Sequence, residues 1–259
     1  MPRVSVITVV KDHHSGLDNT HKSLLKQEFT DWEMIIVDGH SKDGTLAMAR
    51  ALELNDSRIR VQEQESTGIY GAMNEGINLA NGKFSWFMNA GDKFDSSSSL
   101  GHAVAEIVDG SVGVVIGGYQ IENRHREKIY QFPSKDLTQL GFAFNRRGGC
   151  HQAMIFQTKV LVEVGGFDTS YSLASDFDLV LKVIKKSSGR RVSEVLATIE
   201  PGGRADQGIF LVHQQKHLIR GSLLGGTPVR IASFLWTFLA RSKIISRGLI
   251  NKINIRHTK

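Results

Sequence analysis

Residues 4–10 have the sequence Val-Ser-Val-Ile-Thr-Val-Val, a β-branched and largely apolar run that is typical of a buried strand. A polar segment of helical length follows this run, and a second apolar run lies at Met34–Val37. Further patterns predict strands at Arg58–Gln62 and Lys83–Met88 and helices at Thr45–Leu54 and Ile69–Leu79. Strands and helices that alternate in this way form βαβ units around a mostly parallel sheet, so the expected fold class is α/β.

The second half of the chain alternates less regularly. Apolar patterns there predict strands at Val112–Tyr119, Lys128–Phe132 and Arg191–Ile199, and one helix at Asp176–Lys186, and a further short run lies at Ala153–Phe156. The composition, with 41% hydrophobic and 22% charged residues in 259, is that of an ordinary soluble globular protein. The single cysteine, Cys150, excludes an internal disulfide framework and a zinc site made of thiolates alone, and it weakly favours a reducing compartment.

Positive charge is concentrated at the C-terminal end of the chain. The net charge is +6, but nine of the 32 Lys and Arg residues, and no acidic residue, follow Asp206. The rest of the chain therefore has 23 basic and 26 acidic residues, so no nucleic-acid partner is expected. No apolar run approaches the ~20 residues of a spanning helix, and residues 4–10 are expected to form a buried strand rather than a signal peptide.

The basic segment also has helical periodicity. Its apolar face would carry Ile231, Phe234, Leu235, Phe238 and Leu239. A basic helix with such a face is suited to an anionic membrane surface, where each Lys or Arg contributes roughly 1 kcal/mol. The alternative is an ordinary helix packed on the body of the protein. The expected localisation is accordingly cytoplasmic, either free or peripheral on the inner face of the cytoplasmic membrane.

Carboxylates follow three of the predicted strands. Asp12 lies two residues past the first strand, Asp38 directly follows the second, and Asp92 lies four residues past the strand that ends at Met88. Ligands of parallel α/β sheets bind beyond the carboxyl ends of the strands, so these side chains are the first candidates for a site. At that edge Asp38 would accept a hydrogen bond from a base N–H or a ribose hydroxyl. A tight turn with Asp43 or Ser41 capping the next helix is the structural alternative.

Two further acidic segments have both a structural and a functional interpretation. Asn89-Ala90-Gly91-Asp92 is a small-residue loop in which a carboxylate would hold Mg²⁺ or Mn²⁺ together with a substrate phosphate, or it is a polar turn. Asp176-Phe177-Asp178 begins a predicted helix, where the two carboxylates would complement the helix dipole, or one of them would be a general base. His151 would contact an acceptor or metal, or be a hydrogen-bonded structural residue. A thiol mechanism at Cys150 is not expected.

Taken in order, these segments resemble the inverting nucleotide-sugar glycosyltransferases of family 2, which have the GT-A fold. The resemblance covers roughly residues 3–205. It rests on several motifs in the same order: residues 4–8 (VSVIT), 38–45 (DGHSKDGT), 68–77 (GIYGAMNEGI), 89–92 (NAGD), 151–152 (HQ), 165–168 (GGFD) and 176–179 (DFDL). It implies a Rossmann-like, mostly parallel mixed sheet flanked by helices, with the basic helical tail added.

The resemblance also implies roles for individual residues. Asp92 would bind the Mg²⁺ or Mn²⁺ that bridges the diphosphate, and Asp176 would be the catalytic base. The donor nucleotide-sugar would be bound by Thr8, Asp12, Asp38, Gly68, Ala72, Asn74, Asn89 and Arg204. Arg204 belongs to Gly202-Gly203-Arg204, which resembles the family's mobile loop, although a surface turn is an equal alternative.

Four positions depart from the family's pattern. Asn89 stands where the first acid of the D-x-D-like motif is found, and Ser175 stands where a Glu often precedes the base. Gly71 and Glu75 replace an Asp and a Lys that are common in the third-helix motif. The substitution of Asn89 removes a charge next to the expected metal, so the identity of the sugar and the affinity for metal are not fixed by the resemblance.

The resulting functional hypothesis is an inverting glycosyltransferase. It would move a sugar from a UDP-, GDP- or dTDP-sugar to a hydroxyl of a glycan or lipid-linked acceptor in the synthesis of a surface polysaccharide or glycolipid. We expect residues 1–205 to form the GT-A domain, with a nucleotide-binding half at 1–95 and an acceptor-binding half at 96–205, and residues 206–259 to form the tail. The alternative is a catalytically silent nucleotide-sugar-binding or scaffold protein of the same fold, which Asn89 and Ser175 favour.

Overall fold

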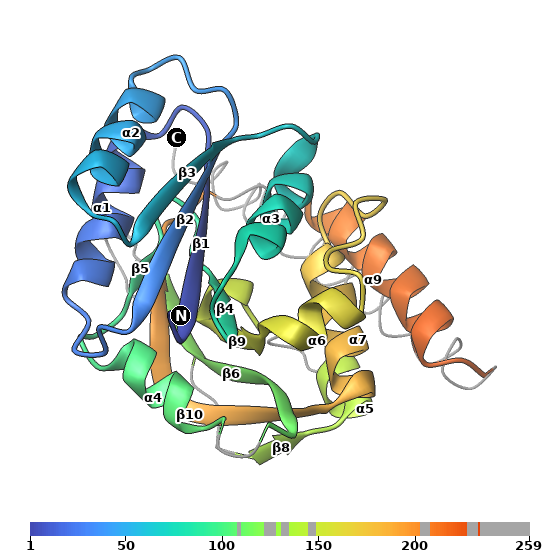
Figure 1. The fold of residues 1–259 in the computed structure, drawn as a ribbon. Coiled ribbons are helices and arrows are strands. Elements are labelled where there is room, and N and C mark those ends of the chain that lie inside the picture. The colour runs from blue at the N-terminus through green and yellow to red at the C-terminus, as the bar shows by residue number, and fades with distance from the viewer. Residues whose placement is uncertain are drawn as a thin grey trace, which may run out of the picture.

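The computed structural model describes residues 1–107, 110–121, 128–130, 135–144, 149–202, 208–226 and 233. In these residues one mixed sheet has the strand order β3-β2-β1-β4-β9-β6-β10-β5, with β7 paired to β6 and β8 paired to β10 (Figure 1). The strands are β1 (Val4–Val10), β2 (Trp32–Asp38), β3 (Ile59–Glu63), β4 (Phe84–Phe87), β5 (Lys93–Phe94), β6 (Val112–Ile121), β7 (Lys128–Tyr130), β8 (Lys135–Leu137), β9 (Met154–Gln157) and β10 (Ser188–Ile199).

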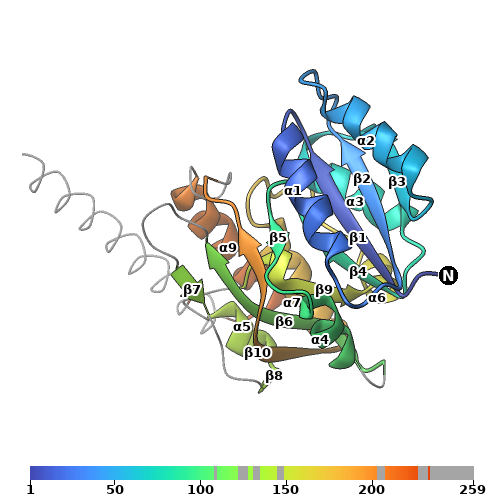
Figure 2. The ribbon, with the colours of Figure 1, turned by 90° about the vertical axis from the view of Figure 1, so that its left-hand side faces the viewer.

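Helices cover both faces of the sheet. They are α1 (His14–Leu25), α2 (Thr45–Asn55), α3 (Gly68–Leu79), α4 (Ser99–Ala105), α5 (Gln139–Ala143), the short 3₁₀-helix η1 (His151–Ala153), α6 (Thr158–Glu163), α7 (Ser175–Lys186) and α9 (Ile209–Leu223). Two buried clusters divide them: α1, α2 and α4 pack on one face, and α3, α5, α6, α7 and α9 pack on the other. Figure 2 shows α1 and α2 in front of the first strands, with α3 behind them.

Alternation along β1 explains the two layers. Ile7 and Val9 belong to the cluster under α3, whereas Val4 and Val6 belong to the cluster under α1. All seven residues of the strand are buried, as expected for a strand in a parallel sheet that is covered on both faces. β1 pairs in parallel with both β2 and β4, so the carboxyl ends of these strands meet at one edge of the sheet.

The second half of the sheet is mixed. β9 is antiparallel to both β4 and β6, while β6 and β10 are parallel and lie side by side (Figure 2). The two-residue strand β5, directly after Asp92, pairs antiparallel with the end of β10. This pairing places the Asn89–Asp92 loop next to the residues that follow β10.

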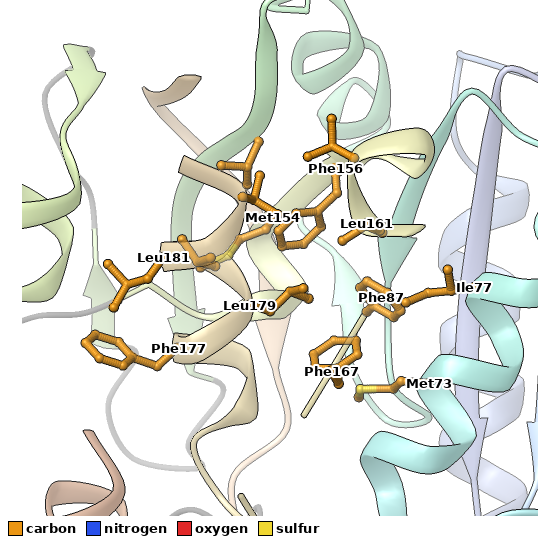
Figure 3. Close-up of a cluster of buried hydrophobic side chains, with 14 of the residues drawn as sticks. Met73, Ile77, Phe87, Met154, Phe156, Leu161, Phe167, Phe177, Leu179 and Leu181 are labelled. Carbon is orange, nitrogen blue, oxygen red and sulfur yellow. The ribbon is translucent and has the colours of Figure 1, made fainter. Parts of the chain in front are cut away.

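The start of α7 is held by an aromatic cluster. Phe177 is buried and stacks on Phe142 with ring centroids 5.5 Å apart. Figure 3 shows Leu179 pointing toward Phe87 and Phe167, while Phe177 points to the other side of α7, and both belong to one buried cluster. Burial of this face fixes the first turn of α7, and therefore the backbone of its neighbour Asp176.

Helix α9 lies in the segment that the sequence suggested as a basic tail. It packs against α7, with Ile219 fully buried and with the Arg220 Nε donating a 2.8 Å hydrogen bond to the carbonyl of Ala143. Ser233 is also buried, with its Oγ 2.9 Å from His217 Nδ1 on α9. The predicted helix at 231–239 otherwise lies outside the described residues. Among the helices described, none is long and apolar enough to cross a membrane.

Candidate active site

The carboxyl ends of β1 and β2 carry two fully buried polar side chains, Thr8 and Asp38. One Asp38 oxygen, Oδ1, accepts a 2.8 Å hydrogen bond from the backbone N–H of Ser41. The other oxygen, Oδ2, and the Thr8 hydroxyl have no hydrogen-bond partner among the described residues. Because a buried polar atom without a partner is costly, these two atoms suit a ligand that brings its own donors and acceptors.

Asp12 joins the loops that follow β1 and β2. Its Oδ1 accepts a 2.6 Å hydrogen bond from the N–H of Lys42, and its own N–H donates to the Ser41 hydroxyl at 2.8 Å. Asp12 also has a left-handed backbone, with φ of 49°. Asp43 accepts from the N–H of Thr45, the first residue of α2, but the N-cap of that helix is Gly44 and not Asp43. These contacts hold both loops at the carboxyl edge of the sheet.

The Asn89–Asp92 loop is held from below by Thr20 of α1. The Thr20 hydroxyl donates to the Asp92 carbonyl at 2.7 Å and accepts from the Gly91 N–H at 3.0 Å. Thr20 is fully buried. A threonine inside an amphipathic helix has no local sequence pattern that indicates such a role, so Thr20 is not among the residues predicted from the sequence.

Asp92 itself is only 5% exposed, and both of its carboxylate oxygens have partners. Gln152 Nε2 donates to Oδ2 at 2.7 Å, and the Glu200 N–H donates to Oδ1 at 2.9 Å. Burial raises the pKa of the Asp92 carboxyl to about 6, the nearby negative charge of Glu200 adds to the rise, and the two hydrogen bonds oppose it. A nearby cation would favour the ionised form.

Two side chains that the sequence analysis did not select border this loop. The Glu200 carboxylate lies over Gly91 and 3.5 Å from His13 Nε2. Glu200 directly follows β10, so the strand-end rule that selected Asp38 would also have found it.

His151 connects the Asn89–Asp92 loop to Asp176. Its Nε2 lies 3.2 Å from Asn89 Nδ2, and its Nδ1 lies 3.7 Å from Asp176 Oδ2. Gln152 is hydrogen-bonded to Asp92 and His151 contacts Asp176, so these two neighbouring residues of η1 hold both carboxylates at one site. The structure therefore brings Asn89, Asp92 and Asp176 together.

Asp176 lies at the N-terminus of α7, with its side chain 26% exposed. Burial would raise the pKa of its carboxyl, but His151, the positive charge of Lys216 and the Phe177 N–H, which donates at 2.8 Å, together hold the pKa below its ordinary value. Asp176 is therefore ionised at neutral pH. Lys216 belongs to α9, so this part of the basic segment contributes charge to the site, which the sequence analysis did not predict.

Cys150 contacts the same network. Its thiol donates to Gln152 Oε1 at 2.6 Å, and the amide nitrogen of that glutamine faces Asp92. Burial raises the pKa of the Cys150 thiol, so the nucleophilic thiolate is not available at neutral pH. The thiol instead orients the Gln152 amide.

The remaining sequence candidates lie on or near α3. Gly68 begins this helix with φ of +76°, and Ala72 is buried. The Asn74 amide is bonded to the backbone of Phe167 at both ends, at 2.9 and 2.8 Å, and so ties α3 to the loop before α7. Contact of these three residues with a nucleotide remains a prediction. Arg204 lies outside the described residues.

Comparison with known proteins assigns the family. Residues 5–165 match the family model "Glycosyl transferase family 2". The chain belongs to this family. It is also 25% identical over 253 residues to "PGL/p-HBAD biosynthesis glycosyltransferase" of Mycobacterium bovis (strain BCG / Pasteur 1173P2), covering 96% of this chain and 94% of that relative.

Solved glycosyltransferase structures share the fold. S. aureus TarS 1-349 has a TM-score of 0.70 at 18% identity, over 96% of this chain and 73% of that one, and the same fragment is known in complex with UDP-GlcNAc. The mannosyltransferase PcManGT from Pyrobaculum calidifontis, in complex with GDP-Man and Mn²⁺, has a TM-score of 0.65 at 17% identity, over 97% of this chain and 81% of that one. The expected GT-A architecture is confirmed, and the protein is a glycosyltransferase of family 2.

Proposed function

We propose that this family 2 enzyme transfers a sugar, with inversion, from a nucleotide-diphosphate sugar to a hydroxyl of a glycan or lipid-linked acceptor, and that it requires a divalent cation. The observation that carries the proposal is the link between Asp92 and Asp176 through the adjacent His151 and Gln152. A cation-binding carboxylate and a base at one site are what such a transfer needs.

The residues present fit a Mg²⁺ or Mn²⁺ ion. Asp92 offers carboxylate oxygens, and Asn89 Oδ1 is buried without a hydrogen-bond partner among the described residues. These are the hard oxygen ligands that both ions prefer, and such ions usually share them with substrate phosphates. When bound, the ion would stabilise the negative charge that develops on the departing nucleoside diphosphate.

Asp176 would remove the proton from the acceptor hydroxyl. The freed electron pair on that oxygen would form the new bond to the anomeric carbon while the bond to the diphosphate breaks, so one attack inverts the configuration. Asp176 is equipped for this step because His151 and Lys216 favour its ionised form. A positioned base of this kind contributes roughly 10²–10⁴-fold to the rate.

The substrates are proposed from the chemistry of the site and from relatives. Thr8 and Asp38 offer unpartnered buried atoms for the base or ribose, and the related folds bind UDP-GlcNAc or GDP-Man. A relative named for PGL/p-HBAD biosynthesis favours a glycolipid-type acceptor. We propose that residues 1–205 form the GT-A domain, with a nucleotide-binding half at 1–95 and an acceptor-binding half at 96–205. We also propose that the basic segment at 206–259 makes peripheral contact with anionic lipid.

Product formation with Mn²⁺ tests the function. UDP-, GDP- and dTDP-sugars should be offered with a membrane-extract acceptor, and release of the nucleoside diphosphate should require Mn²⁺ and the acceptor. NMR of the product would show an anomeric configuration opposite to that of the donor. A protein that binds a nucleotide-sugar and Mn²⁺ but transfers nothing to any extract would instead be the silent binding protein.

A further inference from the structure

The Asn89–Asp92 loop has one carboxylate where the family pattern has two. Asn89 supplies an amide oxygen but no charge, and in the described residues no three His, Cys, Asp or Glu side chains form a metal-binding group by themselves. A divalent ion held by Asp92 and a diphosphate would be stabilised by a second negative group nearby. A second negative charge near the cation would therefore have to come from a residue that lies beside the loop.

Strand pairing brings Glu200 to this loop. β5 and β10 are antiparallel, with Ala197 opposite Phe94 and Thr198 opposite Lys93. Continued by two residues, the same register puts Glu200 opposite Gly91. The 2.9 Å hydrogen bond from the Glu200 N–H to Asp92 Oδ1 agrees with this placement.

Gly91 makes room for the Glu200 side chain. A Cβ at position 91 would lie 2.0 Å from Glu200 Oε2, so the carboxylate would have to move aside, and the φ of +101° at this position also favours glycine. The carboxylate therefore lies over Gly91 of the loop and 3.5 Å from the Nε2 of His13, the N-cap residue of α1. It is 47% exposed, so a ligand at the carboxyl edge of the sheet would reach it.

We propose that Glu200 supplies the second carboxylate of the divalent-cation site, replacing the charge that Asn89 lacks. This inference rests on the proposed cation-dependent function. It explains why an amide is tolerated at position 89. The second acidic group is supplied by Glu200, which follows β10 and lies over the end of the loop, and not by the first residue of the loop.

Mn²⁺ binding to the full chain, measured by EPR of the ion alone and with UDP or GDP, tests the inference without an activity assay. Glu200→Gln should weaken Mn²⁺ binding by about tenfold or more. Asn89→Asp combined with Glu200→Gln should restore most of that loss, because the charge returns to the family's usual position. Glu194→Gln, at an exposed glutamate on β10, the strand that Glu200 follows, is the matched control and should bind like the wild type.

The possible outcomes separate the two proposals. If Asp92→Asn abolishes Mn²⁺ binding but Glu200→Gln leaves it unchanged, the role of Glu200 is wrong and the proposed function stands. If Glu200→Gln weakens binding but Asn89→Asp does not restore it, the replacement of one charge by the other is wrong. A wild-type protein that binds no Mn²⁺ under any of the three conditions would contradict both proposals.

Discussion

His151 Nδ1 lies 3.7 Å from Asp176 Oδ2, and this contact joins η1 to the first turn of α7. Asp176 is the second residue of α7, which packs on the same face of the sheet as α3, whereas His151 begins η1, which contacts β4, β6 and β10. The same histidine also contacts Asn89. Because a base must keep its position relative to the cation site, this bridge is where the geometry of the proposed reaction is set.

Replacing Asp176 by Asn should reduce transfer by about 10²–10⁴-fold while nucleotide binding changes less than about threefold, because the base acts only on the acceptor. Initial rates of nucleoside diphosphate release and calorimetric UDP or GDP binding would measure both effects. Asp178→Asn is the matched control: its carboxylate is paired with Lys182 at 2.6 Å, outside the site. Equal losses in the two variants, or wild-type turnover in Asp176→Asn, would refute the base assignment.

Replacing His151 by Ala should move the acid limb of the pH–rate profile to higher pH. His151 helps to hold the pKa of Asp176 below its ordinary value, so its removal raises that pKa and leaves more of the base protonated at a given acidic pH. The expected shift in the limb of kcat/KM is about one pH unit. His102→Ala, on the exposed side of α4, serves as the control, and an unmoved limb in His151→Ala would show that the contact does not tune the base.

Local patterns were sufficient for most of the regular structure. The predicted strand at 4–10 is β1, the predicted helix at Ile69–Leu79 is α3 to within one residue, and the predicted helix at Asp176–Lys186 is α7. These elements have continuous apolar runs or a clear helical face, so their patterns lie within a few neighbouring residues. The resemblance to family 2 has motifs in both halves of the proposed 1–205 domain, and it therefore predicted that the two halves form one fold.

Elements and residues whose roles depend on distant partners were not predictable in this way. β5 has two residues and exists because it pairs with β10, about a hundred residues away. The basic composition of residues 206–259 predicts a tail that includes α9. It gives no sign of the tertiary contacts that bury Ile219 and Arg220 of this helix. Thr20 and Lys216 act on the site through tertiary contacts alone.

Asp92 should make the unfolding free energy of the cation-free protein fall as pH rises. Its pKa is about 6 in the folded protein, whereas the ordinary value of 3.8 applies to the unfolded chain. Between these two pH values the folded protein therefore binds more protons than the unfolded chain. Stability from this group is therefore complete below pH 4 and is lost as pH passes 6, by at most about 3 kcal/mol.

Urea unfolding in EDTA at pH 4.5, 5.5 and 7, compared between wild type and Asp92→Asn, isolates this contribution because the other titrating groups are common to both proteins. The difference in unfolding free energy, wild type minus variant, should become more negative with rising pH. A difference that stays constant across the three pH values would contradict the burial argument for Asp92.

Replacing Thr20 by Val should destabilise the protein and weaken Mn²⁺ binding together. The hydroxyl is the partner of the Gly91 N–H and the Asp92 carbonyl, and its loss leaves both backbone groups buried without that partner, at a cost of about 1–3 kcal/mol. Thr20→Ser keeps the hydroxyl and removes one methyl group, so it should cost less than about 1 kcal/mol and bind Mn²⁺ like the wild type. Urea unfolding and Mn²⁺ EPR on both variants measure the two effects. If Thr20→Val unfolds like Thr20→Ser, the loop that carries Asp92 does not depend on α1 for its shape, and the rigid placement of the carboxylate must come from Gln152 and the backbone of Glu200 alone.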